Sequence, residues 1–105
     1  MTDISNNEKT VDLINVIIVK PGYQQHIIDN VQGILNQIAK KHPGFISSTV
    51  YKSLDGTQVV YFIRWRSPDD GLAWFENIND ALKLTKGVIE KADYHLYEVV
   101  ETISL

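Results

Sequence analysis

Apolar residues dominate the segment VDLINVIIVK at 11–20, and its valine and isoleucine content predicts a β-strand that the Pro-Gly pair at 21–22 ends. From 23 to 42 the apolar positions instead fall three and four residues apart. This spacing predicts a helix with one buried stripe. The stripe consists of Ile27, Ile28, Val31, Ile34, Leu35 and Ile38.

A hairpin is expected next. The β-rich segments FISSTVYKSL (45–54) and QVVYFIRW (58–65) flank Asp55 and Gly56, a residue pair that tolerates a tight turn. The sequence SPDD at 67–70 then predicts a helix start, with a serine cap, a proline in the first turn and acids near the positive end of the helix dipole.

The second crossover is expected as two helical pieces. A short helix should hold Leu72, Trp74 and Phe75, and a second helix, capped at 79–80, should run to about 92. The segment at 94–105 is expected to close the chain as a strand. Right-handed crossovers place both helical layers on one face of the sheet. The order βαββαβ predicts an α+β fold, a ferredoxin-like sandwich with an antiparallel sheet, over 11–105, preceded by a flexible lead-in at 1–10.

Both faces of the predicted strands are apolar. In the first strand Leu13 and Ile17 point one way while Ile14 and Val16 point the other, and the strand at 58–65 behaves alike. Strands that are apolar on both sides are covered on both sides, yet the helices cover only one face. The sequence therefore predicts a homodimer that packs sheet against sheet. Arg64 and Arg66 are expected near the rim of that interface, paired with Glu98 or Glu101.

Composition narrows the functional class. The chain of 105 residues has a formal net charge of -3 and scattered basic residues, which gives no footprint for nucleic acid or an anionic membrane. It has no cysteine, so disulfides and thiolate metal sites are excluded. Its polar start carries no readable signal peptide, and no apolar run is long enough to span a bilayer, so a cytoplasmic location is expected.

The familiar catalytic motifs are absent, and the histidines at 26, 42 and 95 do not have metal-ligand spacing, so no metal is expected. One polar residue, Asn15, interrupts an apolar stripe. It is either a structural asparagine bonded to a neighbouring backbone group or tyrosine hydroxyl, or a donor aimed at a ligand in a cavity. Trp65 and Trp74 are likewise either core residues or the walls of a pocket for a flat hydrophobic ligand.

The segment HPGFISSTVYKSLDGTQVVYFIRWRS at 42–67 resembles the antibiotic biosynthesis monooxygenase (ABM) family. The resemblance lies in the Pro-Gly-Phe after the first helix, the Ser-x-Asp-Gly hairpin and the Trp-x-Ser before the next helix. VIIVKPG before the first helix and ADYHLYEVV near the end also fit, so about 11–100 is covered. This resemblance implies a dimeric α/β-barrel, and the family includes oxygenases that oxidise phenols, anthrones or quinols without metal or flavin.

The resemblance also implies site residues. Quinone-forming members have an asparagine four residues before a tryptophan, and here Tyr61 and Trp65 stand at those positions. A heme-degrading branch uses a first-strand asparagine, a tryptophan after the hairpin and a later histidine. Asn15 and Trp74 match the first two, but Leu84 stands where the histidine would fall.

These observations lead to three functional hypotheses. The first is a cofactor-independent monooxygenase that oxidises a small aromatic substrate with O2, with Asn15, Tyr61, Trp65 and Trp74 lining the catalytic site. The second is a non-catalytic dimer that binds a small molecule. The third is a heme-binding or heme-degrading monooxygenase, which the missing histidine disfavours.

Overall fold

A computed structural model of the chain describes residues 10–82 and 87–105. Its strands are β1 (Val11–Val19), β2 (Phe45–Lys52), β3 (Gln58–Trp65) and β4 (Ile89–Tyr97), and its helices are α2 (Gln24–Gln37) and α3 (Pro68–Leu82), with a 3-10 turn, η1 (Ala39–Lys41). The strands form one antiparallel sheet in the order β2-β3-β1-β4. This confirms the predicted ferredoxin-like α+β fold. The predicted lead-in, apart from Thr10, lies outside the described residues.

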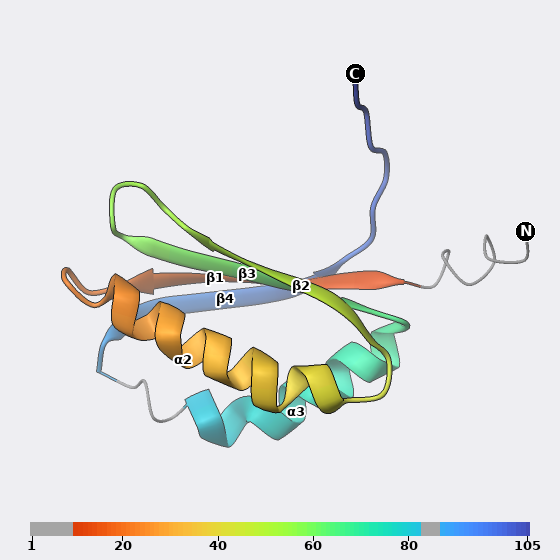
Figure 1. The fold of residues 1–105 in the computed structure, drawn as a ribbon, viewed down its shortest axis with the longest axis horizontal. Helices are drawn as coiled ribbons and strands as arrows, with labels where there is room; N and C mark the ends of the chain where they lie inside the picture. Colours follow the sequence, from red (N-terminus) through yellow and green to blue (C-terminus); the bar gives the residue numbers. More distant parts are fainter. Residues whose placement is uncertain (1–9, 83–86) are drawn as a thin grey trace, which may run out of the picture.

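Both helices pack on the same face of the sheet, as Figure 1 shows. The core lies between them and the alternate residues of the two central strands, including Leu13 and Ile17 of β1 and Ile63 of β3. The helical stripe predicted from the spacing supplies the opposite side, with Ile27 and Leu35 buried. Neither α2 nor α3, the helices of the described chain, has the length and hydropathy needed to cross a membrane.

The predicted turn at Asp55 and the predicted helix cap at Ser67 are both present. At the hairpin, the hydroxyls of Ser53 and Thr57 each donate to the carboxylate of Asp55 at 2.7 Å, and these bonds lower the pKa of Asp55. At the start of α3, the backbone N–H of Asp70 donates to the hydroxyl of Ser67 at 3.2 Å, and that hydroxyl donates to the Asp70 carboxylate at 2.9 Å. Ser67 therefore caps the helix as predicted.

The predicted split of the second crossover is wrong. α3 continues without a break through Asn79 and Asp80, which were expected to cap a second helix, and β4 begins at Ile89, inside the expected second helix. The reason is tertiary pairing. Ile14 lies opposite His95 and Ile17 opposite Ala92, so the free side of β1 recruits 89–97 as an edge strand despite helix-like spacing of its apolar residues.

The last strand also ends earlier than predicted. β4 stops at Tyr97, which lies opposite Asp12, one residue from the first residue of β1. Residues 98–105 therefore have no strand left to pair with, and they form an arm that leaves the sheet on the side opposite the helices (Figure 1). Apolar side chains of this arm are exposed, Val100 to 94% and Ile103 to 83%.

The face of the sheet that the helices leave open carries the alternate apolar residues, as predicted. Ile14, Val16, Val60 and Phe62 on this outer face are only partly buried in the single chain. Arg64 and Arg66 do not pair with Glu98 or Glu101, as the sequence predicts, but with two aspartates.

Arg64 binds Asp12, its cross-strand neighbour, with bonds of 2.8 and 3.0 Å. Arg66 binds Asp70, four residues along the chain, at 3.3 Å. Glu98 and Glu101 lie beyond β4, on the arm, whereas both aspartates lie close to the arginines in the sheet register or along the chain. Asp12 also raises the pKa of Arg64, so that arginine stays charged.

Two helical glycines should respond oppositely to alanine. A Cβ on Gly71 would lie 3.1 Å from Trp65 Cδ1 and 3.3 Å from Leu96 Cδ2, whereas a Cβ on Gly33 meets nothing within 4 Å. We expect Gly71→Ala to lower the free energy of unfolding by about 1 kcal/mol or more, because the buried tryptophan has no room to move. Gly33→Ala should raise it by up to about 1 kcal/mol through helix propensity. Urea titration of both variants tests this, and a stabilised Gly71→Ala protein would show that α3 shifts freely.

Candidate active site

The first part of the site is a buried polar pair on the two central strands. Antiparallel pairing places Asn15 of β1 directly opposite Tyr61 of β3, and both side chains point toward the helices. The Asn15 side-chain N–H donates to the Tyr61 hydroxyl at 3.1 Å. Each residue is only 2% exposed. The predicted structural reading of Asn15, an amide bonded to a tyrosine hydroxyl, is therefore correct for its nitrogen.

The second part is an aromatic pair. Trp65 ends β3 and Trp74 lies in α3, and their ring centres are 5.6 Å apart. Both side chains are fully buried. Trp65 is further enclosed by edge-on contacts with two rings, whose centres lie 5.3 Å (His42) and 6.0 Å (Phe45) from the centre of the indole. The glycine at 71 allows the first turn of α3 to approach the Trp65 ring.

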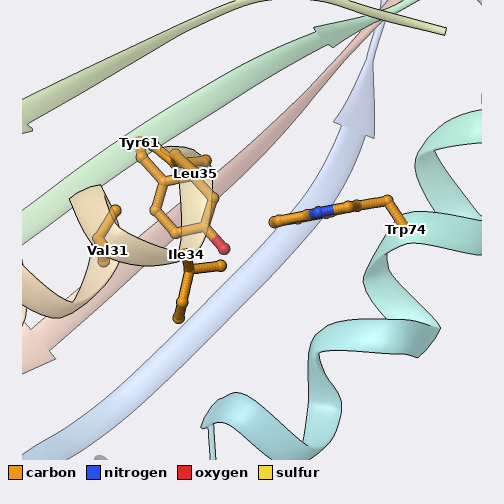
Figure 2. Close-up of a pocket in the computed structure, with 5 residues that line it drawn as sticks. All are labelled: Val31, Ile34, Leu35, Tyr61 and Trp74. Atoms are coloured by element: carbon orange, nitrogen blue, oxygen red, sulfur yellow. The ribbon is translucent and has the colours of Figure 1, made fainter. Parts of the chain in front are cut away.

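A small hollow joins the two pairs. Figure 2 shows Tyr61 and Trp74 facing each other across it, while Val31, Ile34 and Leu35 of α2 form its remaining wall. Its volume is about 10 Å³. The predicted residues thus form one continuous series: Asn15 bonds Tyr61, Tyr61 faces Trp74 across the hollow, and Trp74 contacts Trp65.

Polar atoms without partners are concentrated in this series. Within residues 10–82 and 87–105, the buried side-chain polar atoms that lack a hydrogen bond are Asn15 Oδ1, Trp65 Nε1 and Trp74 Nε1. An unsatisfied buried polar group costs about 1–3 kcal/mol, so most such groups in native proteins find partners. Here one acceptor and two donors are left open on three of the four predicted site residues.

Burial raises the pKa of the Tyr61 phenol above its ordinary value of 10.0, and the bond from Asn15 opposes this only in part. Tyr61 is therefore a neutral hydroxyl at physiological pH, able to donate its own proton in a hydrogen bond but unsuited to act as a base. Asn15 and the tryptophans do not titrate. The site can orient a ligand and stabilise negative charge on it, but it offers no strong proton acceptor.

The histidines do not assemble a metal site. His26 lies exposed on α2, His95 lies exposed on β4, and His42 contacts Trp65. In the described ranges no three His, Cys, Asp or Glu side chains come together as metal ligands. Leu84, at the position of the heme branch's histidine, lies outside the described residues.

Sequence reasoning missed one neighbour of the site. Tyr94 of β4 lies opposite Asn15 on the side away from Tyr61, and its ring stacks on Phe75 of α3 with centres 3.6 Å apart. With β4 placed at Ile89–Tyr97, its pairing with β1 sets Tyr94 beside Asn15. The sequence predicts a strand that starts only at Tyr94, so this neighbour does not follow from it. The aliphatic wall from α2 was identified only as part of the core stripe.

Known proteins are similar to this chain in sequence and in fold. Residues 10–79 match the sequence model of the family described as antibiotic biosynthesis monooxygenase. Tetracenomycin-F1 monooxygenase from Streptomyces glaucescens is 36% identical over 70 residues, which make up 67% of this chain but only 62% of that protein. The match therefore spans less than two thirds of the relative's length.

Solved structures agree on the fold. A protein from Shewanella loihica is 23% identical with a TM-score of 0.74, over 90% of this chain and 97% of that one. SnoaB, a cofactor-independent oxygenase from Streptomyces nogalater, is 14% identical with a TM-score of 0.77, again over 90% and 97%. At these identities the likeness establishes the shared architecture.

A comparison of a single variant with a double variant tests whether the hydrogen bond between Asn15 and Tyr61 stabilises the fold. Tyr61→Phe alone leaves both ends of the Asn15 amide without partners, so we expect it to lower the free energy of unfolding by about 1–3 kcal/mol. Asn15→Leu combined with Tyr61→Phe replaces both partners by apolar groups of similar size. The double variant should lie within about 1 kcal/mol of the wild type or exceed it, measured by urea unfolding. A double variant as unstable as Tyr61→Phe would assign the pair a structural role.

Proposed function

The chain belongs to the antibiotic biosynthesis monooxygenase family, and we propose that it is a cofactor-independent monooxygenase that oxidises a small aromatic substrate of the quinol, anthrone or phenol type with O2. The observation that carries this proposal is the set of open polar atoms on Asn15, Trp65 and Trp74, beside the neutral hydroxyl of Tyr61. A flat ring that carries oxygen substituents would supply their missing partners. We assign the catalytic site to these four residues.

The chemistry follows from what the site provides. Because the site residues include no base, the substrate must be acidic enough to lose a proton to solvent. For an anthrone, the carbanion passes one electron to O2, and the resulting carbon radical and superoxide combine into a peroxide. The peroxide takes up a proton and then loses water. Overall, the methylene group of the anthrone and one molecule of O2 become a carbonyl group and one molecule of water.

Each side chain has a distinct role in this scheme. The Tyr61 hydroxyl and the indole N–H groups donate to a substrate oxygen and stabilise the anion from which the electron leaves. Asn15 Oδ1 accepts from a substrate hydroxyl and fixes the orientation of the ring. The two indoles, Trp65 from β3 and Trp74 from α3, clamp the ring and exclude water. The substrate enters by separation of α2 from α3, since typical ligand pockets measure about 300–1,000 Å³, far more than the hollow between these helices.

A non-catalytic binding protein is the second candidate, because open polar atoms around an apolar hollow would serve ligand binding equally well. The two functions differ in oxygen consumption. The heme-binding hypothesis has no further support from the described residues, which bring no histidine to the hollow.

We also propose that a second copy of the chain covers the outer face. Ile14, Val16, Val60 and Phe62 present apolar surface there, and the Asp12–Arg64 ion pair lies on the same face. Between this face and the arm lies a groove of about 420 Å³, lined by Thr10, Ile46, Arg64, Val99 and Thr102. A two-fold related copy would bury both the apolar face and the arm in one closed assembly.

Oxygen uptake by the metal-free protein tests the activity. With a panel of anthrones, hydroquinones and naphthols, we expect uptake that depends on the protein and persists with a chelator present. Tyr61→Phe should lower kcat/KM by about 10- to 100-fold, the loss of one hydrogen bond to an anion. Since the pKa of Tyr61 is raised above 10.0, kcat/KM should rise as the substrate ionises and stay level up to pH 10.

Tyr23→Phe removes a hydroxyl from an exposed tyrosine and should leave the kinetics unchanged. Absence of uptake across the panel, with ligands that still raise the melting temperature, would favour the binding protein instead.

The dimer is tested by a charge on the outer face. We expect the wild type to sediment at twice the chain mass of 11.9 kDa, and Phe62→Asp to sediment as a monomer because each interface would bury two unpaired carboxylates. Leu72→Asp, on the exposed side of α3, is the matched control and should stay dimeric. A dimeric Phe62→Asp protein would rule out the outer face as the interface.

A further inference from the structure

Asn15 lies between two tyrosines on the helix-covered face of the sheet. The register places Tyr61 of β3 directly opposite it on one side and Tyr94 of β4 directly opposite it on the other. The amide N–H of Asn15 donates to the Tyr61 hydroxyl, whereas Oδ1, on the other branch of the planar amide, is buried without a partner. The open acceptor is therefore directed away from Tyr61, and Tyr94 is the neighbour on that other side.

A stacked aromatic pair closes this side of the site. The ring of Tyr94 lies on the ring of Phe75 of α3, with centres 3.6 Å apart and planes at 26°. One turn earlier in α3, Gly71 lies close to Leu96, so the helix follows β4 along its inner face. Because β4 is the edge strand of the described sheet and Tyr94 is 41% exposed, solvent lies directly beyond the pair.

We propose that the Phe75–Tyr94 pair is the end wall of the substrate site and limits the length of the ring system that the site accepts. The inference rests on the proposed function, in which Asn15 Oδ1 accepts from a substrate hydroxyl. Neighbouring strands are about 4.8 Å apart, so a ring bound at Asn15 meets Tyr94 within about the width of one further ring. The stacked rings leave no room between them, and a ring system that extends past the hydroxyl toward β4 would clash with them.

The stack also ties α3 to the sheet, so its loss is expected to lower stability whether or not it bounds the site. Selectivity separates the two roles. A purely structural pair would change the melting temperature of a variant and leave its preference among ligands of different length as it was. An end wall changes that preference, because its removal gives the longer ligand an exit toward solvent that the shorter ligand does not need.

Binding of quinones of increasing length tests the wall without turnover. The two tryptophans of the chain, Trp65 and Trp74, both belong to the site, so quenching of their fluorescence reports binding there. The ligands are hydroxyquinones of two, three and four fused rings, each with its hydroxyl beside a carbonyl group. Tyr94→Val removes the wall from the β4 side and keeps a residue that favours strands, and Phe75→Ala removes it from the α3 side. In both variants we expect the Kd of the four-ring quinone to fall several-fold, while the Kd of the two-ring quinone stays near wild type.

Two controls keep the wall. Tyr94→Phe preserves the stacked ring and should bind all the quinones as the wild type does. Tyr97→Val removes a tyrosine of similar exposure, 46%, from the outer face of the same strand, and it should also leave the ratio of affinities unchanged.

The outcomes separate this inference from the proposed function. An unchanged ratio of affinities in folded Tyr94→Val and Phe75→Ala would overturn the wall, and oxygen uptake by the same proteins would leave the monooxygenase intact. A shifted ratio in a protein that consumes no oxygen with any substrate of the panel would retain the wall and refute the monooxygenase.

Discussion

The pairing of β1 with β3 is the constraint on which the rest of the molecule depends. It sets Asn15 against Tyr61 on the side of the helices, and because side chains alternate along a strand, it sets Ile14, Val16, Val60 and Phe62 on the other side. A shift of one residue in this register would exchange the two faces and place the polar pair outside. The same hydrogen-bonded ladder thus fixes both the candidate site and the apolar face that we assign to a second copy.

Stability alone does not account for the chemistry at the centre of this register. Apolar residues at positions 15 and 61 would fill the same layer without leaving Asn15 Oδ1 open, and an apolar aromatic residue at position 65 or 74 would leave no unpaired indole N–H. Each open atom lowers stability by about 1–3 kcal/mol, and all of them lie along one connected series of side chains. Their concentration on that series, with the described remainder of the buried side chains satisfied, is what a ligand site predicts and what a packing defect does not.

The sequence was sufficient for the fold and for the positions of the candidate site residues within it, and its failures have a common cause. The strand patterns, the cap at Ser67 and the turn at Asp55 depend on neighbouring residues, so they could be predicted. The positions of Asn15, Tyr61 and the tryptophans followed from alternation and from family resemblance. The start of β4 depends on an unfilled side of β1, and the partner of Arg64 depends on the register of β1 with β3. Both features depend on pairing between strands far apart in the sequence, which the local spacing of residues does not determine. Tyr94 was missed because the start of β4 was misplaced.

A cofactor-independent oxygenase, as we propose this protein to be, must gain its rate from orientation and from exclusion of water, and the described geometry would favour both. Trp65 is held on several sides by His42, Phe45 and Trp74, and Trp74 shares α3 with Phe75, whose stacking on Tyr94 ties the helix to the edge of the sheet. Asn15, Tyr61 and Trp65 lie on the sheet, so they would keep their mutual positions while α2 and α3 separate to admit the substrate. Groups positioned in this way stabilise developing charge at low reorganisation cost. A second copy over the outer face would stiffen β1 and β3 from behind. Since the polar pair lies on these same two strands, assembly and catalysis would then depend on one element of structure.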